Sequence, residues 1–260
     1  MASAKPVAVI TGASAGIGAA LAHVFADHGH ALVLVARRAP QLKALADLIE
    51  ERGRARPTVI VIDLSRPDAA ARIEEELRES GLEPQYLVNN AGFGLVGDFA
   101  GLDRADQLAM IDLNVRVLTE LSLRFAASLA RHRGGMLNVA SVASFLPGPG
   151  MAVYHATKAY VLSFSEALHC EMQSQGVRVT ALCPGPVVTE FQARARMPDG
   201  YFPRFLARAA ERVAREGYEG MMRGQRVVVP GSTIKIAVSL LRLLPRGLVL
   251  WMLRTAARPR

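Results

Sequence analysis

Short apolar runs alternate with longer amphipathic segments from Pro6 to Arg226. Apolar runs bounded by turn residues are typical of buried parallel strands, whereas apolar positions three and four apart indicate helices packed on a sheet. Strands are predicted at residues 7–11, 31–36, 58–62, 86–89, 135–140, 177–182 and 226–229. Helices are predicted at residues 16–28, 40–52, 67–80, 103–132, 151–175 and 203–222. The alternation predicts an α/β fold, a single doubly wound parallel sheet of about seven strands with helices on both faces.

No linker or internal repeat divides the chain, so residues 1–231 are assigned to one domain and residues 232–260 to a C-terminal extension. With 260 residues and a hydrophobic content of 51%, the chain can bury one substantial core. Two cysteines, Cys170 and Cys183, indicate no disulfide framework and a reducing compartment. Because a strand-like run starts at Val7, no room remains for a signal peptide, and a cytoplasmic protein is expected.

The charge is concentrated at the C-terminus. The chain has 31 basic and 23 acidic residues, and residues 220–260 contain eight of the basic residues and no acid. The body is therefore electrically balanced, and we expect no nucleic-acid partner. The six histidines are scattered, so no metal site is predicted either.

The stretch from Ser141 to Lys158 carries the candidate chemistry. A buried strand ends at Ser141, a Pro/Gly loop follows, and a helix then presents Tyr154 and Lys158 four residues apart on one face. An ammonium at that distance favours phenolate over phenol, so we expect Lys158 to lower the pKa of Tyr154. The Ser141 hydroxyl, at the carboxyl end of its strand, is free to polarise a carbonyl. A surface Tyr/Lys pair without function has the same spacing, so the assignment depends on the other motifs.

A glycine-rich turn, Thr11 to Gly18, joins the first strand to the first helix. Glycine lets the backbone approach a diphosphate closely, and the helix N-terminus offers free N–H groups. The spacing G-x-x-x-G-x-G differs from the common dinucleotide fingerprint G-x-G-x-x-G. The turn favours nucleotide binding, although a plain loop would have a similar composition.

The second strand ends in Ala36-Arg37-Arg38. An acidic residue at this position would bind the adenosine ribose 2′-OH, and the two arginines suit a 2′-phosphate instead. NADP is therefore favoured over NAD. Two solvated arginines at the start of a helix are the alternative.

Further polar positions follow the other strands. Asp63 suits the adenine amino group, and the small residues of Asn89 to Gly92 let a cofactor lie close. Asn114 lies among apolar residues of a helix, so its buried amide needs partners, either the sheet or a water of a proton relay. The turn from Pro184 to Thr189 is expected at the nicotinamide carboxamide.

Together these motifs resemble the short-chain dehydrogenases/reductases, over about residues 6–230. The resemblance is carried by Thr11 to Gly18, Asn89 to Gly92, Asn114, Ser141, Tyr154-x-x-x-Lys158 and Pro184-Gly185-x-x-x-Thr189. It implies a Rossmann-like fold and an NAD(P)-dependent oxidoreductase, for which the arginines after the second strand favour NADP(H). In one respect the chain departs from NADP-preferring members, which often carry a basic residue where Ala15 stands.

The resemblance also implies residue roles. Tyr154 would be the general acid/base, Ser141 would orient the substrate carbonyl, and Lys158 would bind the nicotinamide ribose, with Asn114 supporting the proton relay. The implied nucleotide contacts are Gly12, Ser14, Gly16, Ile17, Gly18, Arg37, Arg38, Asp63, Leu64, Asn90, Ala91, Gly92, Tyr154, Lys158, Pro184, Gly185, Val187 and Thr189.

Apolar residues fill the loops that follow the strands, so a hydrophobic ketone or aldehyde, or the matching alcohol, is the expected substrate. These loop residues are Phe93, Val96, Phe99, Phe145, Leu146, Pro147, Pro149, Met151, Phe191, Met197, Tyr201 and Phe202. Reduction of a 3-oxoacyl group on a carrier protein is an alternative. A non-enzymatic NADP-binding regulatory protein is another, although both Tyr154 and Lys158 are present.

The extension at residues 232–257 is apolar, interrupted at Pro245 to Gly247, and dotted with arginine. Its longest charge-free piece is too short for a membrane span of about 20 residues. Three fates remain open: packing over the substrate mouth or a partner subunit, peripheral contact with a membrane, or docking of an acidic carrier. A homo-oligomer, a dimer or tetramer, is expected from the family resemblance.

Overall fold

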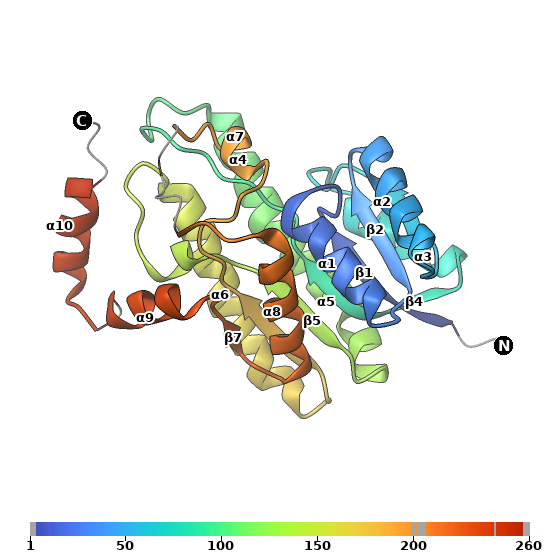
Figure 1. Ribbon diagram of the computed structural model, residues 1–260. Coiled ribbons are helices and arrows are strands. Elements are labelled where there is room, and N and C mark those ends of the chain that lie inside the picture. Colours follow the sequence, from blue (N-terminus) through green and yellow to red (C-terminus); the bar gives the residue numbers. More distant parts are fainter. Residues whose placement is uncertain (1–3, 199–200, 202–205, 242, 257–260) are drawn as a thin grey trace.

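A parallel sheet with the strand order β3-β2-β1-β4-β5-β6-β7 forms the centre of the molecule (Figure 1). The computed structural model describes residues 4–198, 201, 206–241 and 243–256. The strands are β1 (Lys5–Thr11), β2 (Leu32–Ala36), β3 (Thr58–Val61), β4 (Leu82–Asn89), β5 (Gly135–Val139), β6 (Arg178–Leu182) and β7 (Val227–Val228). The strand order reverses between β1 and β4, which is the point where doubly wound sheets bind their ligands. The predicted Rossmann-like fold is confirmed.

Helices cover both faces of the sheet. One layer packs on the first core cluster and consists of α1 (Gly16–Asp27), α2 (Ala39–Glu51) and α8 (Ala210–Met222). The other layer contains α3 (Ala69–Glu79), α4 (Arg104–Ile111), α5 (Leu118–Arg131) and α6 (Ala152–Gln173). Phe25 on α1 and Leu121 on α5 are almost fully buried, one on each side of the sheet. Burying both faces leaves the carboxyl ends of the strands as the open edge.

The strand β4 begins at Leu82, four residues before the start predicted at residue 86. Pro84 lacks an N–H and signals a break in a central strand. The structure accommodates it with a register shift between Val7 and Ala8 of the neighbouring β1, opposite Pro84. The Pro84 carbonyl accepts a hydrogen bond of 2.6 Å from Ser128 Oγ. Val7 pairs with Pro84 and Ala8 pairs with Tyr86, so Gln85 is an extra residue in β4, and this bulge lets the strand continue past the proline.

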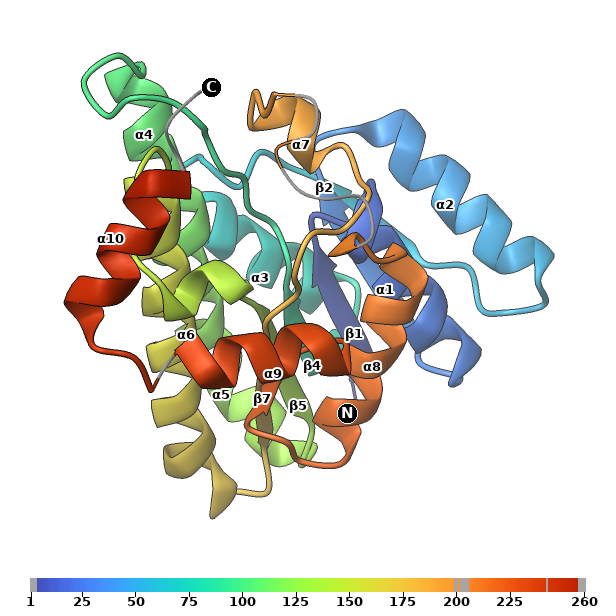
Figure 2. The ribbon, with the colours of Figure 1, turned by 60° about the vertical axis from the view of Figure 1, so that its left-hand side comes forward.

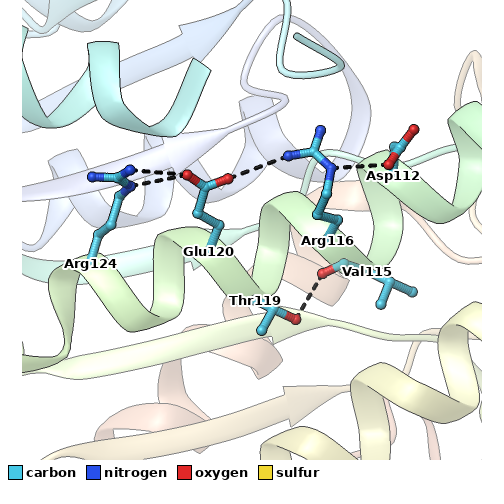
Figure 3. A network of polar contacts seen from close by, with 6 residues as sticks. All are labelled: Asp112, Val115, Arg116, Thr119, Glu120 and Arg124. Atoms are coloured by element: carbon cyan, nitrogen blue, oxygen red, sulfur yellow. Dashed lines mark hydrogen bonds and ion pairs between the residues drawn. The ribbon is translucent and has the colours of Figure 1, made fainter. Parts of the chain in front are cut away.

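The single helix predicted over residues 103–132 is wrong in detail, because a π-helical turn, Asp112–Val117, separates α4 from α5. The wider turn places Asn114 inside the molecule, 1% exposed. On the outer face, ion pairs at i,i+4 spacing run from Asp112 through Arg116 and Glu120 to Arg124, with N–O distances of 3.0, 3.4 and 3.1 Å (Figure 3). Such pairs each contribute about 0.3–0.5 kcal/mol and support the helix across the change of register.

The predicted helix at residues 203–222 is observed as α8 from Ala210, and residues 203–205 of that prediction lie outside the described residues. A short helix, α7 (Phe191–Arg194), precedes it. The C-terminal extension forms α9 (Ser232–Leu241) and α10 (Arg246–Ala256), which stand on the side of the molecule far from α2 and α3 (Figure 1). Within the described part of the chain, no helix is both long enough and apolar enough to cross a membrane.

A buried amide network ties the middle of the sheet to the helices behind it. Asn138 on β5 accepts a 2.9 Å hydrogen bond from Asn89 Nδ2 on β4 and donates one of 2.9 Å to Ser165 Oγ on α6. Asn89 Nδ2 also donates to Ser122 Oγ on α5, at 3.2 Å. Buried amides stabilise a fold when they find partners and destabilise it when they do not.

We expect Asn138→Leu to lower the free energy of unfolding by about 2 kcal/mol, because the apolar side chain leaves the Asn89 amide with fewer partners. Urea unfolding followed by circular dichroism measures the change. Ser165→Ala removes a single partner and serves as the matched control, with an expected loss of about 1 kcal/mol. A stability of Asn138→Leu equal to that of the wild type would contradict a structural role for the network.

Candidate active site

A cleft of about 1980 Å³ lies along the carboxyl edge of the sheet. This volume exceeds that of an ordinary small-molecule pocket and leaves room for a dinucleotide beside a substrate. The cleft is lined by every residue that the sequence analysis assigned to catalysis or nucleotide binding except Gly18 and Asn114. These two lie directly behind the lining and shape it.

The glycine turn between β1 and α1 has the backbone geometry that only glycine adopts readily. Gly12 and Gly16 have φ angles of +65° and +56°. A Cβ on Gly12 would stand 2.8 Å from Asn90 Nδ2, and one on Gly18 would collide with the carbonyl oxygen of Gly12. The turn is thus packed on its inner side and bare on the side of the cleft, where α1 begins at Gly16. A bare backbone at a helix N-terminus suits a diphosphate.

Thr11 connects this turn to the neighbouring strand β4 and the residues that follow it. The sequence analysis missed this role. Its hydroxyl donates to the Val88 carbonyl at 3.1 Å and accepts from the backbone N–H groups of Asn90 and Ala91, at 3.0 and 3.1 Å. Asn90 Nδ2 in turn donates to Thr11 O at 2.9 Å. A hydroxyl at the last position of a strand that leads into a glycine turn was the available signal.

The two arginines after β2 differ in how they are engaged. Arg38 forms an ion pair of 2.8 Å with Glu190 and donates to Ser14 Oγ at 3.2 Å. Arg37 lies 3.8 Å from Asp63, and both side chains are about half exposed at the cleft. Arg37 is therefore the less constrained of the two cations.

The carboxylate of Asp63 is held in its ionised form. Partial burial opposes this, but two hydrogen bonds from Ser65 and the charge of Arg37 keep the pKa of Asp63 below its ordinary value. The bonds come from Ser65 N at 3.0 Å and Ser65 Oγ at 2.9 Å. An oriented carboxylate at this edge can accept hydrogen bonds from a ligand.

Ser141 and Tyr154 meet inside the cleft. Ser141 follows β5 by two residues, and its hydroxyl accepts a 3.1 Å hydrogen bond from Ala143 N, at the start of the 3₁₀ turn η2 (Val142–Phe145). Tyr154 comes from the first turn of α6, and the Ser141 side chain lies close enough to its phenol to oppose the rise of the Tyr154 pKa. Both residues are 8% exposed. The structure thus brings a hydroxyl and a phenol to one point of the cleft.

Lys158 lies one helical turn beyond Tyr154 and is 6% exposed. Its Nζ donates a 2.7 Å hydrogen bond to the Val139 carbonyl at the end of β5, and lies 6.0 Å from the centroid of the Tyr154 ring. A Cβ on Gly92 would stand 3.4 Å from this nitrogen. The same Cβ would clash with Asn114 Oδ1 at 2.8 Å, so the glycine permits the close packing of Asn114 beside the ammonium.

We expected Lys158 to lower the pKa of Tyr154. For the protein without a nucleotide, this prediction is wrong. Burial raises the pKa of Tyr154 to about 12, and only the hydrogen bond with Ser141 works against that shift. Burial lowers the pKa of Lys158 to about 8. The ammonium is engaged by a carbonyl rather than by the phenol, and removal from water penalises the charged form of both groups. In the protein chain alone, therefore, Tyr154 is a protonated phenol at neutral pH.

Asn114 does not line the cleft but supports its wall. Its Nδ2 donates to Phe93 O at 2.9 Å and to Thr157 Oγ1 at 3.1 Å, and its Oδ1 accepts from Phe93 N at 3.1 Å. Thr157 was missed in the sequence, although it lies on α6 between Tyr154 and Lys158. The amide fixes the segment after β4 against α6. The structure therefore favours the structural alternative for the side chain of Asn114.

The far side of the cleft is largely apolar. It contains Phe93, Val96, Leu146, Pro149, Met151, Phe191, Met197 and Tyr201 of the predicted set, together with Leu253 of α10. Phe99, Phe145 and Pro147 are not part of the lining, and Phe202 lies outside the described residues. This side can accommodate a hydrophobic molecule beside Ser141 and Tyr154.

Two arginines at the cleft were missed by the sequence analysis. The Arg194 guanidinium lies 4.3 Å from the centroid of the Phe93 ring, and desolvation followed by the charge of Arg37 lowers its pKa. Arg196 lies 3.6 Å from Asp106. Both follow the turn at Thr189 at a place where apolar residues dominate the sequence. Their approach to the cleft depends on the fold of α7 and could not be read from spacing.

Comparison with known proteins gives consistent matches. A family profile described as short chain dehydrogenase matches residues 6–199. Sulfoacetaldehyde reductase 2 of Chromohalobacter salexigens is 38% identical over 188 residues, which cover 71% of this chain and 74% of that protein.

Solved structures match over almost the whole chain. A short-chain dehydrogenase from Sphingobium yanoikuyae in complex with NADPH has a TM-score of 0.81 at 34% identity, and the alignment covers 97% of this chain and 96% of that one. The bulky-bulky ketone specific alcohol dehydrogenase from Comamonas testosteroni has a TM-score of 0.76 at 31% identity, with 94% of each chain covered.

Burial of Lys158 predicts a pH-dependent stability. The unfolded chain keeps the lysine proton up to its ordinary pKa of 10.5, and the folded chain only up to about 8. Folding releases this proton between the two values, so stability rises with pH in that window. Relative to Lys158→Met, the wild type should gain up to about 3 kcal/mol from pH ~8 to pH ~10.5, measured by urea unfolding. Lys43→Met, at an exposed site on α2, is the control, and parallel curves for Lys158→Met and the wild type would contradict the shift.

Proposed function

The chain belongs to the short-chain dehydrogenase/reductase family, and on that premise we propose that it is an NADP(H)-dependent reductase of hydrophobic ketones or aldehydes, or a dehydrogenase of the matching alcohols. The family resemblance predicted from the motifs is thereby confirmed. The observation that carries the proposal is the convergence of the Tyr154 phenol and the Ser141 hydroxyl in the same cleft as the bare glycine turn.

The residues of the cleft fit a nicotinamide nucleotide. The side-chain-free backbone of Gly12 and Gly16 at the start of α1 would hold the diphosphate, with Ser14 and Ile17 beside it and Gly18 packed beneath. The further contacts would come from Asp63, Leu64, Asn90, Ala91, Gly92, Lys158, Pro184, Gly185, Val187 and Thr189. When bound, such a nucleotide supplies a hydride to the carbonyl carbon or accepts one from the alcohol.

Proton transfer would fall to Tyr154. With a pKa of about 12 the phenol is protonated at neutral pH, so it can donate to the alkoxide that develops on carbonyl reduction. The Ser141 hydroxyl would stabilise the same oxygen by a second hydrogen bond. Lys158 would bind the nicotinamide ribose from its position beside Gly92. The protonated phenol of Tyr154 in the protein without a nucleotide thus favours carbonyl reduction.

The preference for NADP rests on Arg37. It stands at the cleft after β2, where Ala36 replaces the acidic residue that would bind a ribose 2′-OH. The Sphingobium relative was solved with NADPH, which supports the same preference here. Arg38 is already engaged by Glu190 and Ser14, so we assign the 2′-phosphate chiefly to Arg37.

A second substrate class is supported by Arg194. Its guanidinium stacks on Phe93 at the cleft, and a relative is named for the reduction of sulfoacetaldehyde, a small anionic aldehyde. A panel of bulky apolar ketones, long aldehydes and sulfoacetaldehyde, assayed by NADPH oxidation, separates the two classes. Activity confined to the anionic aldehyde and lost in Arg194→Gln would replace the hydrophobic assignment.

We expect Tyr154→Phe to lower kcat by at least about a hundredfold while NADPH binding stays nearly unchanged, because the ring remains and only the proton donor is lost. The NADPH oxidation assay measures the loss of turnover, and NADPH fluorescence titration measures the retained binding. Tyr160→Phe, on the exposed side of the same helix, is the matched control. Wild-type turnover in Tyr154→Phe would refute the assigned role.

For Arg37→Ala, we expect NADPH binding to weaken by about tenfold to a hundredfold and NADH binding to change little, since a charge-assisted contact to the 2′-phosphate is lost. Dissociation constants for both nucleotides measure this difference. Lys43→Ala removes a cation from the adjacent helix as a control. Equal losses for NADPH and NADH would count against the contact.

A further inference from the structure

The C-terminal helices α9 and α10 have an inner face that packs on the domain at the cleft. Val238 of α9 and Val249 of α10 are 7% and 4% exposed. Ile234 packs so closely on the turn after β6 that a Cβ on Gly185 would collide with it. Leu253 of α10 lines the cleft itself. The inner face therefore forms part of the mouth of the candidate active site.

The outer face of the same helices, together with the link between them, carries exposed apolar side chains. Leu243 is 82% exposed, the highest value among the exposed large apolar residues of the described chain. The other members of this face are Ile236, Leu240, Leu244, Leu248, Leu250, Trp251 and Met252, with exposures from 38% to 64%. Figure 1 shows α10 as the outermost element on its side of the molecule, and Figure 2 shows it joined through α9 to the rest of the chain. We call this set the outer apolar face.

The described charged side chains of α9 and α10 are cationic. Lys235 on α9 and Arg246 on α10 are exposed, and the sequence of residues 232–256 contains no acid. A twofold contact between two copies would place the same segment against itself and bring like charges together without an acid of that segment to neutralise them. An anionic lipid surface instead supplies both an apolar layer and negative charge.

We propose that α9 and α10 dock the protein on an anionic lipid bilayer, with the outer apolar face in the headgroup region and the mouth of the cleft turned toward the lipid. Amphipathic helices with cationic flanks bind bilayers in this way, without spanning them. The orientation of the cleft rests on the proposed function, because a hydrophobic substrate dissolved in the bilayer would then reach Leu253 and the apolar side of the cleft directly. The docking itself stands on the helices alone.

The experiment uses the full-length protein with vesicles of phosphatidylcholine, with and without phosphatidylglycerol. Trp251 is the single tryptophan of the chain and is 64% exposed on the outer apolar face, so its emission reports the local environment. We expect a blue shift and co-sedimentation with the anionic vesicles, at least about tenfold weaker with the neutral vesicles and reduced by high salt.

The double variant Leu243→Glu/Leu248→Glu should lose vesicle binding by at least about tenfold, because it places acids on the outer apolar face. Leu123→Glu, the same change at a 72% exposed position on α5, is the matched control and should bind vesicles as the wild type does. Far-UV circular dichroism verifies that both variants are folded. Equal vesicle binding by the double variant and the wild type would overturn the proposal.

Two further outcomes would also overturn it. One is the absence of binding to either kind of vesicle. The other is a Trp251 blue shift that depends on protein concentration without vesicles and disappears in the double variant, which would assign the outer apolar face to a second copy. NADPH-dependent reduction of a short, water-soluble ketone should be unchanged in the double variant. Vesicle binding without any reductase activity would refute the proposed function and leave the docking intact.

Discussion

The burial of the Lys158 ammonium beside the end of β5 is the constraint to which the rest of the site is fitted. A charge removed from water needs a compensating partner, and the Val139 carbonyl provides one at 2.7 Å. Holding that contact requires α6 to lie against the carboxyl edge of the sheet, and the same placement brings Tyr154 to Ser141. The cost appears as opposite shifts, with the pKa of Lys158 lowered to about 8 and that of Tyr154 raised to about 12. Keeping the Tyr154 acid and the Lys158 cation inside an apolar cleft therefore lowers the free energy of unfolding.

The sheet order explains why such distant residues meet. Since β1 and β4 lie side by side where the winding reverses, the glycine turn after β1, the segment after β4 and the turn after β6 border one cleft. Side-chain hydrogen bonds hold these segments in place, above all those of Thr11 and of Asn114. The C-terminal helices complete the same edge from outside through Leu253. The candidate catalytic residues, the glycine turn and the mouth of the cleft thus all depend on the same edge of the sheet.

The sequence predicted the sheet, its helices and the residues gathered at the cleft, because apolar periodicity and glycine spacing are local signals. It missed what depends on contacts between distant elements. The start of β4 was placed after Pro84, since the bulge at Gln85 that accommodates the proline leaves no mark on the apolar pattern. The π-helical turn around Asn114 preserves the apolar spacing and was invisible for that reason. The spacing of Tyr154 and Lys158 predicted their proximity correctly, but only the burial of both side chains determines the direction of their pKa shifts.

The charge environment of Tyr154 is the central claim, and ultraviolet difference titration of the wild type against Tyr154→Phe measures it directly. Tyrosinate absorbs where phenol does not, so the difference between the two proteins isolates one ring. With a pKa of about 12, the protein alone should give no difference signal below pH ~10. Saturating oxidised NADP brings a positive charge near the phenol and should shift the signal into the range of pH ~6–9. The same titration curve with and without the nucleotide would contradict the account.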